Sequence, residues 1–309
     1  MQRQRTRIDQ AGLRHLCWNS LLVLLILAGG CTRYHNIRPT DVPASGTDRV
    51  TVLTYNIRTG AGLRKPGRSP YLLQDELQPE IEPIIAAIGS VQPDIVGLQE
   101  VLGEDQAAAI ARALSMNYVY IPHGWERYGT WWGVALLSRF PIMDAWNQEI
   151  SEGPGNTRSN LFARIDIGGT TWCVIVMHRD KDQQDGAALW RTMRAVRSIT
   201  DPVVLLADLN IKPDDRRMAI LSTRFQDSLQ LCGAEPTRKS GIEKTGTLTG
   251  KRARAGIKRI DYILVDRGRL NVYDCGLLDH VYWPASDHIG YFAIIGPGKD
   301  RGNKRQQEN

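Results

Sequence analysis

The sequence predicts an α/β protein in which two mixed β-sheets pack against each other with helices on the outside. Three observations support this fold class. Short apolar and β-branched runs alternate roughly with helical patterns, some neighbouring runs indicate hairpins, and the five-residue apolar run Val203 to Ala207 indicates a strand buried on both faces. The chain has 309 residues, 42% hydrophobic and 23% charged, which is typical of a globular protein.

The first 48 residues are predicted to lie outside this fold. A basic leader, the short apolar run 21–28 and small residues precede Cys31, which indicates a secretory signal peptide over residues 1–30. The position of Cys31 after Ala-Gly-Gly resembles the lipidation site of bacterial lipoproteins. That resemblance implies a chain anchored to a membrane of the cell envelope through acyl groups on Cys31. Residues 31–48 indicate a tether. An ordinary secreted protein or an uncleaved anchor is the alternative.

The main domain is predicted over residues 49–296, and a basic tail over 297–309 is expected to be disordered. Alternating or continuous apolar runs predict strands at 50–57, 93–100, 117–121, 134–138, 161–167, 171–177, 203–207, 260–265 and 289–295. Apolar residues at helical spacing predict helices at 73–89, 104–115, 186–199 and 214–223. Gly168 and Gly169 indicate a hairpin turn.

Three cysteines remain once Cys17 is removed with the signal peptide and Cys31 is lipidated. They are Cys173, Cys232 and Cys275, an odd number without a Cys-x-x-Cys pair. This spacing predicts neither a disulfide framework nor a zinc site. Cys173 lies in an apolar strand and is expected to pack in the core.

Polar side chains recur at the ends of the predicted strands. Asp208 and Asn210 follow the buried strand that ends at Ala207, and on their own they fit a turn equally well. The whole set makes a site the better interpretation, because side chains at strand ends can converge on one crevice. The set is Asn56, Glu100, His178, Asp208, Asn210, Asp261, Asp287 and His288.

These side chains have a coherent chemistry. Carboxylate and amide oxygens are hard ligands that suit Mg²⁺, and Mn²⁺ or Ca²⁺ as alternatives, better than Zn²⁺. Histidines beside carboxylates supply general acid–base groups and hydrogen-bond donors. Together they predict hydrolysis of a phosphoester, in which a metal neutralises phosphoryl oxygens and a histidine activates water.

Several segments also resemble the endonuclease/exonuclease/phosphatase superfamily, which includes deoxyribonuclease I. They are Leu53–Arg58, Asp94–Glu100, Ala135–Ile142, Ala207–Asn210, Arg259–Ile263 and Ser286–His288, in the family's order over about residues 50–296. The resemblance implies a four-layered α/β sandwich. It also implies a divalent-metal-dependent phosphoesterase.

The resemblance assigns a role to each candidate residue. Glu100 is implied as the principal metal ligand, helped by Asn56. His288 resembles the catalytic histidine and Asp261 the carboxylate that orients it. Asp208 and Asn210 resemble the pair that positions the nucleophile and a phosphoryl oxygen, and Asp208 is also implied to contact metal. Asp287 resembles a second metal ligand, and His178 resembles the second catalytic histidine. One departure stands out: deoxyribonuclease I supports that second histidine with a glutamate, where this chain has Trp132 or Gly133.

The substrate is predicted from charge. The chain has a formal net charge of +6 and a pI near 9.1, and segment 236–259 is strongly basic, which fits an anionic partner. The leading hypothesis is a monomeric phosphodiesterase acting on nucleic acid, with an aromatic loop at 122–132 that could stack bases. A lipid or inositol phosphoesterase at the membrane surface is the alternative, and a non-enzymatic interaction module is the third class. The alternatives are that the basic segment is only a solvated loop and that the aromatic loop packs against the rim of the sheet.

Overall fold

A computed structural model describes residues 34–36, 48–63, 80–123, 132–151, 157–233, 242–243, 245–249 and 259–298. The predicted signal peptide, Cys31, the C-terminal tail and most of the aromatic and basic loops lie outside the described residues. Within the described part of the chain, no helix is both long enough and apolar enough to cross a membrane.

Thirteen described strands form two sheets, which confirms the predicted fold class. The first sheet has the spatial order β1-β4-β5-β3-β2-β13-β12, with β1 at Tyr34–His35, β2 at Val50–Asn56, β3 at Ile95–Val101, β4 at Asn117–Pro122, β5 at Gly133–Ser138, β12 at Leu270–Leu277 and β13 at Tyr291–Pro297. The second has the order β10-β11-β9-β8-β7-β6, with β6 at Ile142–Glu149, β7 at Ser159–Ile167, β8 at Thr170–His178, β9 at Val203–Asp208, β10 at Phe225–Asp227 and β11 at Asp261–Asp266.

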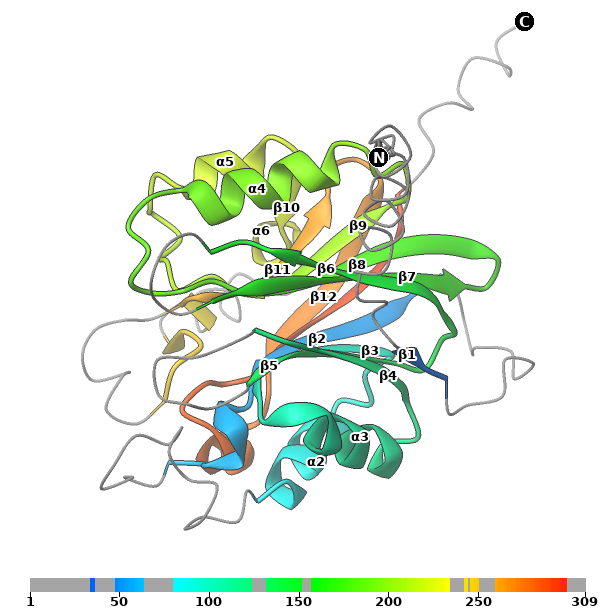
Figure 1. Cartoon of the computed structure of the whole chain (residues 1–309), viewed down its shortest axis with the longest axis vertical. Coiled ribbons are helices and arrows are strands. Elements are labelled where there is room, and N and C mark those ends of the chain that lie inside the picture. The colour runs from blue at the N-terminus through cyan, green and yellow to red at the C-terminus, as the bar shows by residue number, and fades with distance from the viewer. Residues whose placement is uncertain are drawn as a thin grey trace, which may run out of the picture. The chain divides into compact units, whose positions relative to one another are not determined.

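Helices cover the outer face of each sheet, giving four layers (Figure 1). The α-helices are α2 at Glu82–Gly89, α3 at Gly103–Ala113, α4 at Ala187–Val196, α5 at Met218–Ser222 and α6 at Ser228–Leu231, with 3₁₀ turns η1 at Arg58–Gly60 and η3 at His280–Ala285. Helices α2 and α3 pack on the first sheet, and α4 and α5 on the second. Each helix contributes an apolar stripe to its interface.

Alternation along the strands fills the three interfaces. In β9, Val204 and Leu206 point into the space between the sheets, whereas Val203 and Leu205 point towards α4. The five-residue apolar run is therefore buried on both faces, as predicted. The sheets approach closely at Gly97 of β3, where an added Cβ would lie 2.7 Å from the Cβ of Leu206.

The nine predicted strands are present, and four strands were missed: β1, β6, β10 and β12. Of the helix predicted at 73–89, residues 73–79 lie outside the described residues, and α2 begins at Glu82. Strand β6 alternates exposed polar residues with half-buried ones, so its apolar signal is weak, and β10 and β12 are short or polar. The hairpin between β7 and β8 is confirmed, and Gly168 and Gly169 supply its positive φ angles of 60° and 86°. The final strand begins at Tyr291 rather than Ile289.

Part of the predicted tether belongs to the first sheet. Tyr34 and His35 form β1, which pairs antiparallel with β4. The side chain of Asn36 then holds the start of β6, because its Nδ2 donates to the Ile142 carbonyl and its Oδ1 accepts from the Ile142 N–H, both at 3.0 Å. The tether prediction was therefore wrong for residues 34–36.

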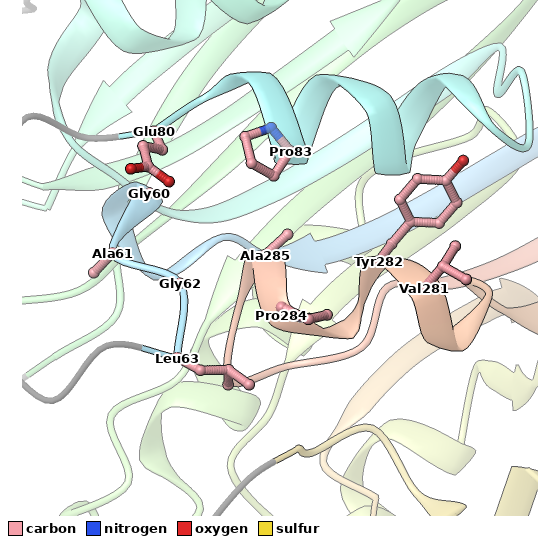
Figure 2. Close-up of a pocket in the computed structure, with 10 residues that line it drawn as sticks. All are labelled: Gly60, Ala61, Gly62, Leu63, Glu80, Pro83, Val281, Tyr282, Pro284 and Ala285. Carbon is pink, nitrogen blue, oxygen red and sulfur yellow. The ribbon is translucent and has the colours of Figure 1, made fainter.

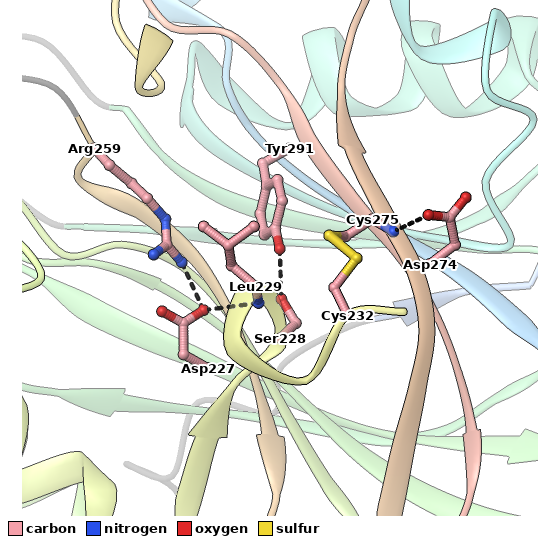
Figure 3. The surroundings of a disulfide bond; sticks show 8 residues. All are labelled: Asp227, Ser228, Leu229, Cys232, Arg259, Asp274, Cys275 and Tyr291. Carbon is pink, nitrogen blue, oxygen red and sulfur yellow. Dashed lines mark hydrogen bonds and ion pairs between the residues drawn. A yellow bond between two sulfur atoms is a disulfide. The ribbon is translucent and has the colours of Figure 1, made fainter. Parts of the chain in front are cut away.

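The prediction of no disulfide was also wrong. Cys232, just after α6, is bonded to Cys275 in β12, and their Cα atoms lie 5.8 Å apart (Figure 3). Cys173 is the odd cysteine, free and buried in β8. An odd number of cysteines does not exclude one disulfide, and a separation of 43 residues gives no information about the distance between two cysteines in the fold.

Removing the disulfide is expected to lower the free energy of unfolding. A bond that closes a 43-residue loop restricts the unfolded chain, and the expected loss for a Cys232→Ala/Cys275→Ala variant is about 2–4 kcal/mol. Chemical denaturation with and without reductant measures it. The wild type should become less stable when reduced, whereas the double variant should not respond. Equal stability of oxidised wild type and double variant would contradict this expectation.

Candidate active site

The predicted site residues come together at one edge of the sandwich. In the first sheet β2 and β3 are parallel, so Asn56 and Glu100 lie side by side. In the second sheet His178 and Asp208 are partners at the ends of the parallel strands β8 and β9. Asp261 opens the antiparallel strand β11 directly opposite Asp208. Strand direction therefore places both sheets' polar ends at the same edge.

Asn56 links the two sheets through its side-chain amide. Its Nδ2 donates to Glu100 Oε1 and to Asp208 Oδ2, each at 3.0 Å, and all three side chains are buried. Its Oδ1 accepts from the Arg58 N–H at 3.0 Å, which fixes the orientation of the amide. Asn56 thus holds two carboxylates close together; its predicted role as a metal ligand stays a prediction.

His288 and Asp261 form a buried pair. His288 Nδ1 lies 2.9 Å from Asp261 Oδ2, and each residue is 1% exposed. This contact leaves His288 Nε2 facing Asp208 Oδ2 at 3.8 Å. The geometry matches the predicted arrangement of a histidine oriented by a carboxylate.

Neighbouring backbone and hydroxyl groups hold this pair in place. The Asp261 N–H donates to Thr247 Oγ1 at 3.2 Å, and the His288 N–H donates to Ser286 Oγ at the same distance. Ser286 Oγ in turn donates to the Asn56 carbonyl at 2.7 Å. The segment that leads into β13 is thereby tied to the end of β2.

A second buried ion pair fixes the entry into β11 (Figure 3). Arg259, two residues before Asp261, donates to Asp227 Oδ1 at 2.6 Å and lies 4.5 Å from the Tyr262 ring centroid. Asp227 also accepts from the Leu229 N–H, so it caps the short helix that leads to the disulfide. Asp227 therefore connects the segment before β11 to the short helix that precedes the disulfide.

His178 faces the same two carboxylates as Asn56. Its Nε2 lies 3.6 Å from Asp208 Oδ2 and 3.9 Å from Glu100 Oε1. The Trp132 ring packs edge-on against it, with centroids 5.1 Å apart. Trp132 thus lies beside His178, and it is one of the two residues that the sequence places where deoxyribonuclease I has a supporting glutamate.

Asn210 and Asp287 lie at the margins of the cluster. The Asn210 N–H donates to Asp208 Oδ1 at 3.0 Å, and its Nδ2 donates to the Arg179 carbonyl at 2.9 Å. Asp287 makes an ion pair with Arg58, whose Nε lies 3.7 Å from Asp287 Oδ2. The predicted role of Asp287 as a second metal ligand stays a prediction.

Backbone strain concentrates at this edge. Six non-glycine residues of the described chain have positive φ, and four of them flank the cluster: Arg58, Thr59, Glu100 and Asn210, at 47° to 55°. Such conformations cost free energy and persist where surrounding structure enforces them, as functional sites do. For Asn210 the strain aims the amide at Arg179 rather than at solvent.

The cluster carries a surplus of buried negative charge that fits a cation. Burial raises the pKa of Asp208 to about 7, helped by Asp261 and opposed by His288. Burial lowers the pKa of His288, but Asp261 and Asp208 outweigh it and raise this pKa to about 10. Without an ion, protons compensate the charge; a divalent cation would do so instead.

Two sets of atoms could hold such an ion. Asp208, Asp261 and His288 offer one ligand atom each within 4.8 Å of one another. However, His288 Nδ1 is already bonded to Asp261, and hard cations prefer oxygen ligands. Glu100 and Asp208, whose oxygens share the Asn56 amide, therefore fit a hard divalent cation better.

Sequence patterns missed three residues around the cluster. Arg58 pairs with Asp287, and its position right after the predicted strand 50–57 was the available signal. His123 and Arg158 surround Trp132: the His123 ring lies 5.7 Å and the Arg158 guanidinium 4.6 Å from its ring centroid. Burial, with Arg158 nearby, holds the pKa of His123 well below its usual value. His123 directly follows β4 and Arg158 directly precedes β7, so the available signal was again a position at a strand end.

The arrangement can perform hydrolysis of a phosphoester. An ion at Glu100 and Asp208 would supply positive charge to phosphoryl oxygens. His288 Nε2 can accept or hold a proton while Asp261 fixes the ring, and His178 and the Asn210 amide can lie beside the reacting oxygens. The fold is the α/β sandwich of the phosphoesterase superfamily, and the site has the groups that such a reaction needs.

Comparison with known proteins identifies the family. The model of the Endonuclease/Exonuclease/phosphatase family matches residues 53–288, and the chain belongs to this family. A comparison with curated proteins gave no match.

Solved structures share the fold at low sequence identity. An endonuclease/exonuclease/phosphatase from Bacteroides vulgatus is 19% identical with a TM-score of 0.62, covering 81% of this chain and 99% of that one. The human Nocturnin catalytic domain with bound sulfate is 18% identical with a TM-score of 0.59, covering 85% and 96%. A mannosyl-6-phosphatase from Bacteroides thetaiotaomicron is 18% identical with a TM-score of 0.56, covering 80% and 99%.

Proposed function

We propose that this protein is a Mg²⁺-dependent phosphoesterase. One observation carries the proposal: the buried His288–Asp261 pair faces Asp208, which shares the Asn56 amide with Glu100. Glu100 and Asp208 would hold the ion, and His288 would move the proton of the attacking water or contact the phosphate. A non-enzymatic module would have no need of this strained, charged and buried cluster.

The proposed substrate is a phosphodiester of nucleic acid, because the chain is basic overall and its segment 236–259 is strongly so. A lipid or inositol phosphoester is the second candidate, favoured by the predicted lipidation of Cys31. The solved structures do not choose between them, since one sharing this fold is a mannosyl-6-phosphatase.

We also propose that the protein works in the cell envelope, outside the cytoplasm. The predicted signal peptide over residues 1–30 and the lipidation site at Cys31 support export. The Cys232–Cys275 disulfide supports it independently, because disulfides persist mainly in oxidising compartments.

The function is tested by a substrate panel with and without metal. Purified protein is incubated with plasmid DNA, with phospholipid vesicles and with an inositol phosphate, in Mg²⁺ or in EDTA. We expect strand cleavage or head-group release in Mg²⁺ and complete loss in EDTA, restored by excess Mg²⁺. Absence of product from every substrate in Mg²⁺, Mn²⁺ and Ca²⁺ would refute the proposal, and activity that persists in EDTA would refute its metal dependence.

A further inference from the structure

The two sheets support the catalytic edge in different ways. On the first-sheet side, a pocket of about 360 Å³ opens between the segment after β2 and the turn η3 (Figure 2). On the second-sheet side, the buried residue Arg179 directly follows His178 at the end of β8 and contacts the segment Asp208–Asn210, here called the catalytic segment. Arg179 thus connects two parts of the chain that carry candidate catalytic residues.

Three contacts join Arg179 to the catalytic segment. Its N–H donates to the Asp208 carbonyl, and its carbonyl accepts from Asn210 Nδ2, both at 2.9 Å. Its guanidinium reaches the residue between them, because Nη1 donates to the Leu209 carbonyl at 3.4 Å. The first two contacts use the backbone of Arg179, so the third is the one that depends on its side chain.

The same guanidinium also holds the loop between β8 and α4. Its Nη2 donates to the Asp185 carbonyl at 3.3 Å. Arg217 binds the two preceding residues, because its Nη1 donates to the Gln183 and Gln184 carbonyls, each at 3.1 Å. Three successive carbonyls of this loop thus accept from two arginines, one of which, Arg179, also binds the catalytic segment.

The burial of Arg179 is not explained by stability alone. The residue is 0% exposed, and its Nε has no hydrogen-bond partner in the part of the chain that the structure describes. Burial, helped by Arg217 and opposed by Asp215, lowers its pKa. Burying a guanidinium costs free energy that two long hydrogen bonds to carbonyls offset poorly. Such a residue beside Asn210, whose φ is 53°, indicates a role in the site.

We propose that Arg179 is a positioning residue of the active site: its guanidinium holds the Leu209 carbonyl and thereby keeps Asp208 and Asn210 in the arrangement that the reaction uses. The inference rests on the proposed phosphoesterase function. Because Arg179 is fully buried, it acts through the catalytic segment rather than by touching the substrate. Its removal should therefore lower kcat and leave KM little changed.

Two substitutions of Arg179 and one control test this role. Arg179→Met keeps a long side chain without the guanidinium, and Arg179→Lys keeps the charge and a donor. Arg217→Met is the matched control, because Arg217 supports the same loop through Gln183 and Gln184. We expect Arg179→Met to lower kcat by about 10- to 100-fold, as a small misplacement of reacting groups does, and Arg179→Lys to recover part of this loss. Arg217→Met should lower the Tm but leave kcat near the wild-type value.

A double-mutant cycle with Asn210→Ala shows whether the effect passes through the catalytic segment. Arg179→Met should lower kcat much less in the Asn210→Ala background than in the wild type. Hydrogen exchange of the Asn210 N–H, which donates to Asp208 Oδ1, gives a readout that needs no activity. This exchange should be faster in Arg179→Met than in Arg217→Met. If the methionine variant does not fold, Arg179→Lys takes its place in both measurements, with smaller changes in the same direction.

The possible outcomes separate the two proposals. Additive losses of kcat, an equal loss in Arg217→Met or unchanged exchange at Asn210 would overturn the positioning role and leave the proposed function standing. Absence of wild-type activity on the whole substrate panel would overturn the proposed function, and with it any catalytic role of Arg179. In that case the exchange measurement would still decide whether Arg179 holds the catalytic segment.

Discussion

Replacing His288 by alanine is expected to lower kcat by about 10²- to 10⁴-fold while the protein remains folded. His288 Nε2 is the imidazole atom that faces Asp208, and Asp261 holds the opposite ring nitrogen at 2.9 Å. Removing the ring deletes the group that would move the proton. Steady-state kinetics on the substrate that the panel identifies measures the loss, and circular dichroism checks the fold.

Two further variants make this experiment decisive. Asp261→Asn keeps a side chain of the same size but removes the charge that orients His288, so kcat should fall there as well, with KM little changed. His35→Ala is the matched control, because the His35 side chain is 39% exposed, pairs with Glu104 and stacks on Tyr118, and β1 is the edge strand of the first sheet. A His288→Ala protein with near-native kcat would refute the role assigned to His288.

Replacing Glu100 by glutamine is expected to raise the Mg²⁺ concentration needed for half-maximal activity by about 10- to 100-fold or more. Losses of about 10- to 100-fold in metal affinity are typical when a residue that hydrogen-bonds to a metal ligand is mutated, and Glu100 would be a ligand itself. Glutamine preserves an oxygen that can accept from the Asn56 amide, as Glu100 Oε1 does, but it lacks the charge that attracts the ion. Activity should recover in part at high Mg²⁺. A Mg²⁺ titration of the reaction rate measures the shift.

Thermal denaturation gives an independent readout of the same change. An ion that binds only the folded state stabilises the protein by RT ln(1 + [L]/Kd), about 2.7 kcal/mol at 100 times Kd. Mg²⁺ should therefore raise the Tm of the wild type more than that of Glu100→Gln. Glu104→Gln is the control, since the Glu104 side chain is 55% exposed and pairs with His35 at 2.9 Å. Identical Mg²⁺ responses in wild type and Glu100→Gln would exclude Glu100 as a ligand.

Strand patterns predicted much of the candidate site because of how sheets are built. A strand buried on both faces must end where the core ends, so polar residues after Ala207 or before Tyr262 lie at an edge. The recurrence of such residues after several strands predicted a common location, which the registers of β8, β9 and β11 confirm. Weakly apolar elements such as β6 left no comparable signal.

Contacts between distant segments could not be predicted in this way. Cys232 and Cys275 are 43 residues apart, and only the docking of α6 against β12 brings them together. The Asp227–Arg259 pair and the Trp132–His178 contact likewise join segments that are far apart in the chain. Neither the number of cysteines nor the local periodicity of apolar residues carries information about these distances.

The sequence by itself therefore determined the fold class, the family resemblance and the set of polar strand ends, because period and local composition dictate which residues face a core. The tertiary structure decided how those ends are connected: Asn56 bridges two carboxylates across the sheets, and Asp261 holds His288. These features depend on the relative placement of two sheets, which is set by side-chain packing over the whole core rather than by any one segment.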